Sequence, residues 1–240
     1  MRNRGLSDLW LRITGLVLVA VSTFGGAFER KGLPADLRTA TVSQLTAVVA
    51  LEAVSWIAIP IFAWLLYRGF VRTRNVGRYA GRIAVLAVVS EVPYDLATTG
   101  RPWDPSSQSP VFALLVALVV LWAVDRLRRG PVRRTGLSVL VIVAGVLWLT
   151  IFDVGLRLGV MPAGVVLLLF CLVFYYLHDK ENTMMAVGGV LGAVAFVLPA
   201  LGVAILHFRN DQPGRPYPRL LFYVLYPAVL LGAGLLGRMS

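Results

Sequence analysis

The sequence has few residues that can hold a metal or form a disulfide. Among 240 residues there are one cysteine, Cys171, and two histidines, His178 and His207. A lone cysteine cannot form a disulfide within the chain, and no cysteine or histidine spacing matches a zinc site. A nucleophile elbow and a Walker loop are also missing, which excludes the common serine-hydrolase and nucleotide-triphosphatase motifs. We therefore expect no metal site and no chemistry of those two classes.

Charge is scarce as well. Only 15% of the residues are charged, 58% are hydrophobic, and the mean hydropathy is +0.78. This composition is typical of an integral membrane protein. The net charge of +11 comes from 23 lysines and arginines against 12 acidic residues. The excess lies in short loops without interleaved aromatic residues, so membrane topology and lipid headgroups explain it, and we expect no nucleic acid partner.

Eight apolar blocks fill most of the chain. They cover residues 9–28, 44–67, 79–97, 110–125, 136–152, 160–178, 183–207 and 219–237. Most are long enough to cross a bilayer as a helix, and all are too continuous for barrel strands. The sequence therefore predicts a single all-α domain over residues 1–240, a polytopic transmembrane helical bundle of about eight spans. If block 183–207 breaks near Leu198-Pro199, where proline interrupts a helix, the count becomes nine.

Arginines indicate which loops face the cytoplasm. Loops 68–82 and 126–134 hold five arginines each, whereas loops 98–109 and 154–160 hold one each. The positive-inside rule places the arginine-rich loops and the N-terminal Met1–Arg4 on the cytoplasmic side of the cell membrane.

Two further features bear on the topology. With eight spans, the C-terminal arginines fall on the outer side, and if block 183–207 splits they fall on the cytoplasmic side. These arginines are Arg209, Arg215 and Arg219. The first apolar block, residues 9–28, is closer to the length of a span than to that of a signal-peptide core, so we expect a retained first helix.

The first candidate site is the arginine-rich segment that runs into block 79–97. Its possible phosphate-binding residues are Arg72, Thr73, Arg74, Arg78 and Arg82. Planar guanidinium groups bind phosphate in a bidentate manner, so a nucleotide or a coenzyme with phosphate groups would fit. The alternative is that these arginines are only the topology signal of a cytoplasmic loop.

The second candidate site is a polar motif, residues 90–95, in the middle of an apolar block. Glu91 lies roughly 13 Å beyond Arg82 along a helix with a rise of about 1.5 Å per residue, which is near the middle of the hydrocarbon layer. A carboxyl group there costs at least about 2.5 kcal/mol unless it is paired or faces water. Glu91 and Asp95 share a helix face, as a general acid or base pair would. A structural pairing with Arg12 or Arg82 is the alternative.

A third carboxyl group lies at membrane depth in block 44–67. Glu52 is roughly 12 Å from the outer end of its block near Gln44, at the same rise per residue. It is thus level with Glu91, and the two could line one cavity. Intramembrane carboxyl groups also serve proton and cation paths, so a small transporter that uses Glu52, Glu91 and Asp95 is a further hypothesis.

Taken together, these motifs resemble the TraX family of multi-span membrane proteins. The matching pieces are Pro60-Ile61-Phe62, Gly69-Phe70, Thr73-Arg74-Asn75, Tyr79, Arg82, Ser90-Glu91-x-Pro93-x-Asp95, Asp153-x-Gly155 and Phe222-Tyr223-x-x-Tyr226-Pro227. The resemblance implies an acyltransferase that uses acetyl-CoA or another acyl-CoA and acts on a protein terminus, a lipid or a glycan. On this hypothesis the arginine segment binds the coenzyme phosphates, and Glu91 or Asp95 deprotonates the acceptor.

The sequence departs from the family pattern at three places. Ser22-Thr23 stand where the resemblance implies an Asp-His pair, Trp56 stands in place of an arginine, and Val229 in place of a histidine. Serine and threonine hydroxyls do not accept a proton at neutral pH without help. The alternative is therefore a catalytically inactive relative that acts as a membrane scaffold or regulator in envelope assembly.

Overall fold

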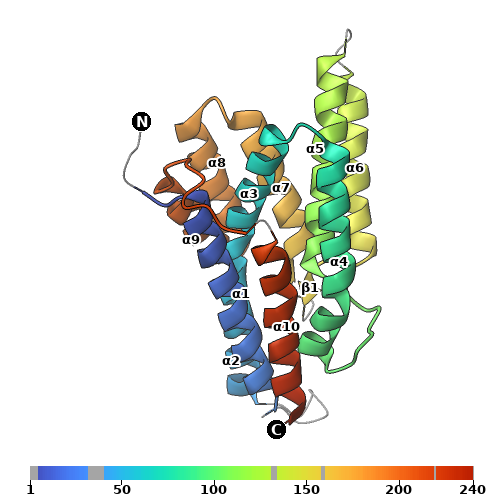
Figure 1. Ribbon diagram of the computed structural model, residues 1–240, viewed down its shortest axis with the longest axis vertical. Coiled ribbons are helices and arrows are strands. Elements are labelled where there is room, and N and C mark those ends of the chain that lie inside the picture. The colour runs from blue at the N-terminus through green and yellow to red at the C-terminus, as the bar shows by residue number, and fades with distance from the viewer. Residues whose placement is uncertain (1–4, 32–40, 131–133, 158–159, 219, 240) are drawn as a thin grey trace.

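The protein is a bundle of helices, as the computed structural model shows for residues 5–31, 41–130, 134–157, 160–218 and 220–239 (Figure 1). The helices of these ranges are α1 Asp8–Lys31, α2 Val42–Trp56, α3 Ala58–Arg72, α4 Val76–Thr99, α5 Pro110–Arg129, α6 Thr135–Ile151, α7 Ala163–Leu177, α8 Glu181–Val194, α9 Leu198–His207 and α10 Leu221–Met239. Two short strands, β1 Leu156–Arg157 and β2 Met161–Pro162, pair antiparallel. The prediction of an all-α bundle is confirmed. Met1–Arg4 and Arg219 lie outside the described residues.

Within the described ranges, four helical segments are long and apolar enough to cross a membrane. They are Asp8–Glu29, Val42–Arg72, Pro110–Arg129 and Leu221–Arg238. Shorter apolar helices are Thr135–Ile151, Ala163–Leu177 and Leu198–His207. The predicted membrane class is therefore supported by several helices of spanning length, whereas the predicted count of about eight spans is not confirmed.

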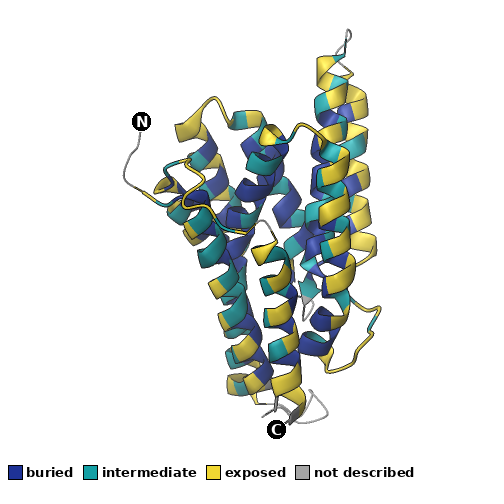
Figure 2. Cartoon of the chain, in the orientation of Figure 1, coloured by how far each residue is buried: buried dark blue, intermediate teal, exposed yellow. Residues whose placement is uncertain are grey.

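The outward faces of the bundle are apolar. Exposed residues cover the outer sides of α4 and α6 (Figure 2), and most of those on α6 are apolar, such as Leu140 at 64% exposure. Large apolar surfaces of this kind are rare on soluble monomers, and they agree with a bundle that lies in a membrane. The buried core lies between α3, α5 and α7, around Trp64, Leu118 and Phe170.

Arginines gather at one end of the bundle, which we call the basic end. It is the end at which α1 and α4 begin and α3 and α5 finish, at the top of Figure 1. The opposite end carries loop 100–109 and residues 152–157 and 160–162. The segment before α1 lies against the segment after α9, since Leu6 and Arg209 form a parallel bridge and Arg68 pairs with Asp211 at 3.0 Å.

Block 183–207 splits into two helices, which is one of the two predicted alternatives. α8 finishes at Val194, and α9 begins at Leu198 with Pro199 in its first turn. Between them Phe196 and Val197 have φ of 62° and 66°, a region that is strained for a β-branched residue. Because the chain turns back here, Arg209 lies at the basic end, as predicted for the split.

A second break lies between α2 and α3, within the long apolar segment 42–72. Pro60 stands in the first turn of α3, and its ring nitrogen cannot donate the helical hydrogen bond to Trp56. The turn between α8 and α9 packs beside this break, because the rings of Trp56 and Phe196 lie 5.4 Å apart. Gly202 of α9 also lies against the break, where a Cβ atom would collide with the carbonyl oxygen of Ile57.

Candidate functional site

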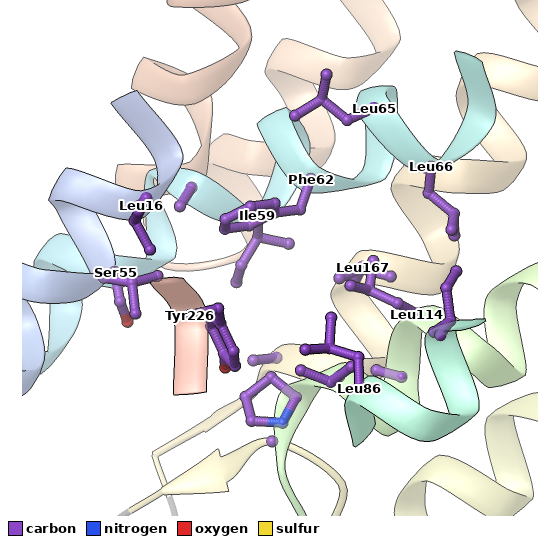
Figure 3. A pocket seen from close by; sticks show the side chains of 18 of the residues that line it. Leu16, Ser55, Ile59, Phe62, Leu65, Leu66, Leu86, Leu114, Leu167 and Tyr226 are labelled. Carbon is purple, nitrogen blue, oxygen red and sulfur yellow. The ribbon is translucent and has the colours of Figure 1, made fainter. Parts of the chain in front are cut away.

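An apolar cavity of about 190 Å³ lies inside the bundle, beside the break between α2 and α3. Its walls come from α1, α2, α3, α4, α5, α7 and α10, and Figure 3 shows their side chains converging on it. The aliphatic and aromatic lining includes Leu16, Ile59, Phe62, Leu66, Leu86, Leu114 and Leu167. On α1 the cavity touches Arg12, Leu16 and Val19, so at a rise of about 1.5 Å per residue it follows that helix for roughly 10 Å.

Polar groups in the cavity wall fall into two zones. The polar lining residues are Arg12, Glu52, Ser55, Tyr79, Tyr223 and Tyr226. Arg12, Tyr79 and Tyr223 stand near the starts of α1, α4 and α10, at the basic end. Glu52 and Ser55 belong to the last turns of α2, at the break. An apolar chamber with a few convergent polar groups is typical of a small-molecule site.

The zone at the break is built from α1 and α2. Glu52 is 8% exposed, and its backbone carbonyl accepts hydrogen bonds from the hydroxyl groups of Ser55 (2.8 Å) and Ser22 (3.3 Å). Broken helices are tolerated at membrane depth where they line a cavity or are buried in protein. A carboxyl group at such a place is a functional candidate, since it is expensive to keep there without a use.

The zone at the basic end adjoins a second, polar pocket of about 360 Å³. Its lining residues are Asp8, Arg12, Arg72, Pro213, Gly214, Arg215, Pro216 and Tyr217. Arg12 lines both this pocket and the apolar cavity, so its side chain lies between them. The guanidinium carbon of Arg12 is 5.9 Å from the centre of the Phe222 ring, and its Nε is buried without a hydrogen-bond partner among the described residues.

Two aspartates neutralise part of the positive charge at the basic end. Asp8 pairs with Arg72 at 2.7 Å and with Arg68 at 3.4 Å. Asp211 pairs with Arg68 at 3.0 Å and with Arg209 at 3.2 Å. These contacts fix the end of α3 to the start of α1 and to the segment after α9.

The predicted phosphate-binding residues are only partly brought together. Arg72 lines the polar pocket, where it is paired with Asp8. Arg74, Arg78 and Arg82 are exposed around the start of α4 and line neither of the two pockets described above.

Thr73 and two of these arginines also have local contacts. The Thr73 hydroxyl donates to the Asn75 carbonyl oxygen at 3.3 Å, and the Arg78 backbone N–H donates to the Asn75 side chain at 2.9 Å, which caps α4. The Arg82 guanidinium lies 5.9 Å from the centre of the Tyr79 ring. The predicted segment thus forms a capped helix start with an exposed basic face.

The predicted carboxylates hold a loop at the opposite end of the bundle. Glu91 accepts a hydrogen bond from the Ser109 backbone N–H at 3.0 Å, and Asp95 accepts one from the Asp104 backbone N–H at 3.0 Å. Neither lines the apolar cavity or the polar pocket, and neither forms an ion pair with an arginine of the described residues. Glu52 lines the apolar cavity and Glu91 does not, so the alternative in which the two line one cavity does not hold.

The same loop carries a charged aspartate at the surface. Hydrogen bonds from the Ser106 side chain and backbone lower the pKa of Asp104, whose Oδ1 lies 3.0 Å from the Ser106 nitrogen. The loop is thus held by its own turn as well as by α4.

Arg12, Glu52 and Arg215 are the site residues on which the sequence motifs place least weight. Arg12 stands near the start of an apolar block and Glu52 stands inside one, so the sequence itself marks both as unusual charged residues. Arg215 lies in a proline-rich loop far along the chain, and nothing in the sequence marks it as a site residue. Over the described ranges, no three His, Cys, Asp or Glu residues are grouped as metal ligands.

Comparison with known proteins gives a family. The sequence model described as TraX protein matches residues 39–236. No curated protein and no solved structure matches the chain. The matched range runs from the residues before α2 to the last turn of α10, and so includes both helix breaks and most of the cavity wall.

Proposed function

Because this chain belongs to the TraX family, we propose that it is a membrane-embedded acyltransferase. In the proposed reaction an acyl group moves from acyl-CoA, with acetyl-CoA as the simplest donor, to an amine or hydroxyl acceptor on a protein terminus, a lipid or a glycan. The observation that carries the proposal is the apolar cavity lined by Glu52 and Arg12, with Arg12 also lining the polar pocket at the basic end. A thioester donor would use both features, since its phosphates need cations and its thioester needs protection from water.

In this proposal the basic end faces the cytoplasm, where acyl-CoA is found. The positive-inside rule supports this orientation in the cell membrane, with a cytoplasmic N-terminus. In this proposal the predicted coenzyme-binding residues meet the coenzyme at the basic end. Arg72 lines the polar pocket, and Thr73, Arg74, Arg78 and Arg82 belong to the segment around the start of α4.

We assign the role of proton acceptor to Glu52. Its carboxylate would take the proton from the acceptor N–H or O–H, and the acceptor atom would attack the thioester carbonyl. The carbon–sulfur bond then breaks, and coenzyme A leaves as a thiolate that takes up the proton. The position of Glu52 supports this role. The Ser22 hydroxyl donates to the Glu52 backbone carbonyl, so Glu52 lies beside Ser22 and Thr23, where the resemblance implies an Asp-His pair.

The test compares carboxyl groups at the two places. The protein in lipid nanodiscs is given radiolabelled acetyl-CoA, and hydrolysis or transfer is followed in the variants Glu52→Gln, Glu91→Gln and Asp95→Asn. We expect Glu52→Gln to lower the rate by about 100-fold, since general base catalysis typically contributes that much or more. Binding of acetyl-CoA should be kept, and the other two variants should remain active.

Other results would redirect or overturn the assignment. Loss of turnover in Glu91→Gln or Asp95→Asn, with Glu52→Gln unaffected, would return the role of base to α4 as the sequence motif predicts. Absence of acetyl-CoA binding by the folded wild-type protein would contradict the acyltransferase proposal itself.

A second candidate function is a catalytically inactive relative that acts as a membrane scaffold or regulator in envelope assembly. One observation favours it: the described residues that line the cavity include no histidine. If this candidate is correct, a cell in which all three carboxyl groups are neutralised keeps its envelope phenotype, provided that the protein still inserts. Loss of the phenotype in a normally inserted Glu52→Gln variant would rule it out.

A further inference from the structure

The polar pocket at the basic end has positive charge that the described residues do not neutralise. Three arginines and one aspartate line it, and the aspartate, Asp8, is shared between Arg72 and Arg68. Neither Arg12 nor Arg215 takes part in the ion pairs within the described ranges. A buried guanidinium nitrogen without a partner, such as Arg12 Nε, costs free energy that an anion in the pocket would recover.

The loop that carries Arg215 is held in a fixed position against α1. The backbone N–H of Asp8 donates to the Gln212 carbonyl at 2.8 Å. Gly214 has φ of +82°, and a Cβ atom there would lie 2.6 Å from the Ser7 hydroxyl, so the loop approaches α1 closely. Pro213 and Pro216 restrict the backbone on either side of Arg215. The pocket is therefore preorganised, which lowers the entropy that a ligand must remove on binding.

The apolar cavity and this pocket share Arg12 as a lining residue. An apolar cavity of about 150 Å³ holds the six-carbon ring of benzene, so a cavity of about 190 Å³ has room for a chain of about eight carbons. A ligand that fills both spaces has one anionic end and one narrow, mostly apolar arm. Phosphate suits the anionic end, because several guanidinium groups can surround its oxygens.

We propose that Arg12 and Arg215 bind the phosphate of a phosphate ester whose apolar arm of about eight atoms occupies the cavity between Arg12 and Glu52. Two sources share this chemistry. One is a coenzyme A derivative, whose longer arm with two amides would lie partly in the polar pocket and under the proposed function would bring its thioester to Glu52. The other is a single-chain membrane lipid with a phosphate headgroup.

Octyl phosphate is a suitable probe, because it has the phosphate and the apolar arm but no thioester, so its binding is measured independently of catalysis. Its binding is measured by equilibrium dialysis on protein in phosphatidylcholine nanodiscs, with empty nanodiscs as the blank. We expect saturable binding that weakens at least tenfold in Arg12→Gln/Arg215→Gln. The matched control is Arg126→Gln, another arginine at the basic end that lines neither pocket, and it should bind as the wild type does. Octanol should bind the wild type and the double variant equally.

The control for folding is the single variant Arg215→Gln, since Arg215 is exposed on a loop. It should weaken octyl phosphate binding on its own, while the melting temperature stays unchanged. Unchanged affinity in both arginine variants, or no saturable binding by the folded wild type, would overturn the proposal.

Competition identifies the source of the phosphate ester. Displacement of octyl phosphate by coenzyme A supports the coenzyme, and displacement by lysophosphatidic acid added to the nanodisc lipid supports the lipid. The outcome is independent of catalysis: a protein that binds octyl phosphate through Arg12 and Arg215 but never hydrolyses acetyl-CoA keeps this site and loses the proposed function. A protein that hydrolyses acetyl-CoA equally well with both arginines replaced keeps the function and loses the site.

Discussion

Gly202 is the residue at which α9 meets the break between α2 and α3. A Cβ atom there would collide with the Ile57 carbonyl oxygen and would lie 2.6 Å from the Pro60 ring. The carbonyl is backbone and cannot rotate away, so Gly202→Ala should push α9 off the break. We expect a loss of stability of about 1 to 3 kcal/mol, the usual range for overpacking a tight core contact. Thermal unfolding in detergent measures it.

Gly189 provides the matched control, because it is a helical glycine on the partner helix α8 with open space around its Cβ position. Gly189→Ala should leave the melting temperature equal or slightly higher, since alanine favours a helix over glycine by up to about 1 kcal/mol. Equal melting temperatures for Gly202→Ala and wild type would mean that α9 does not rest on the break.

Arg12 and Glu52 show how far single residues can be interpreted from a sequence. Both are polar residues in apolar blocks, so their unusual positions are predictable from composition alone. Their partners are not. Whether Glu52 shares a cavity with Glu91 depends on how α2 and α4 are rotated, and the structure turns Glu91 toward Ser109 instead. Helix rotation is set by packing across the bundle, which no local pattern encodes.

At the scale of elements, the two breaks depend on each other. The break between α8 and α9 lies at Pro199, and the sequence predicts it as one of two alternatives. The break between α2 and α3 lies at Pro60, but the sequence predicts block 44–67 as one unbroken span. Proline weakens a helix locally, and the result is either a kink or an interruption. The neighbouring element decides, and Gly202 and Phe196 of the second break pack on the first.

The hydrogen bond from the Asp104 N–H to Asp95, which joins loop 100–109 to α4, allows a test of a structural role for Asp95. In Asp95→Leu the Asp104 N–H loses its acceptor, so deuterium uptake by the peptide 100–109 should rise several-fold in hydrogen-exchange mass spectrometry. Asp95→Asn keeps an oxygen that can accept the bond, so its uptake should stay close to that of the wild type.

The control for this experiment is Asp125→Leu, because Asp125 bonds to Tyr175 and Arg129 at the basic end. It should leave uptake in peptide 100–109 unchanged. If Asp95→Leu also leaves that uptake unchanged, the hydrogen bond does not order the loop, and the case for a catalytic role of Asp95 becomes stronger.

At the scale of the whole molecule, hydropathy predicts the class of fold better than the number of spans. Composition alone predicts an all-α membrane bundle, because a bilayer admits few other structures. The count is harder, since several helices are short or charged. α4 has 24 residues but carries Arg78, Arg82, Glu91 and Asp95, and α9 has only 10 residues. α4 packs on α5 and α10, and α9 packs on α3 and α8, so the positions of these helices depend on the rest of the bundle.

The side of the membrane on which the chain after α9 lies follows from the split of residues 183–207. In a variant whose buried Cys171 is replaced by alanine, single cysteines are introduced as Arg74→Cys, Gln212→Cys and Ser106→Cys. A membrane-impermeant maleimide applied to intact and permeabilised cells then reports the side of each position. Gln212→Cys should behave like Arg74→Cys, because Asp8 ties Gln212 and Arg72 to the same end of the bundle. If residues 183–207 crossed the membrane as one helix, Gln212→Cys would instead react together with Ser106→Cys, and the polar pocket could not form.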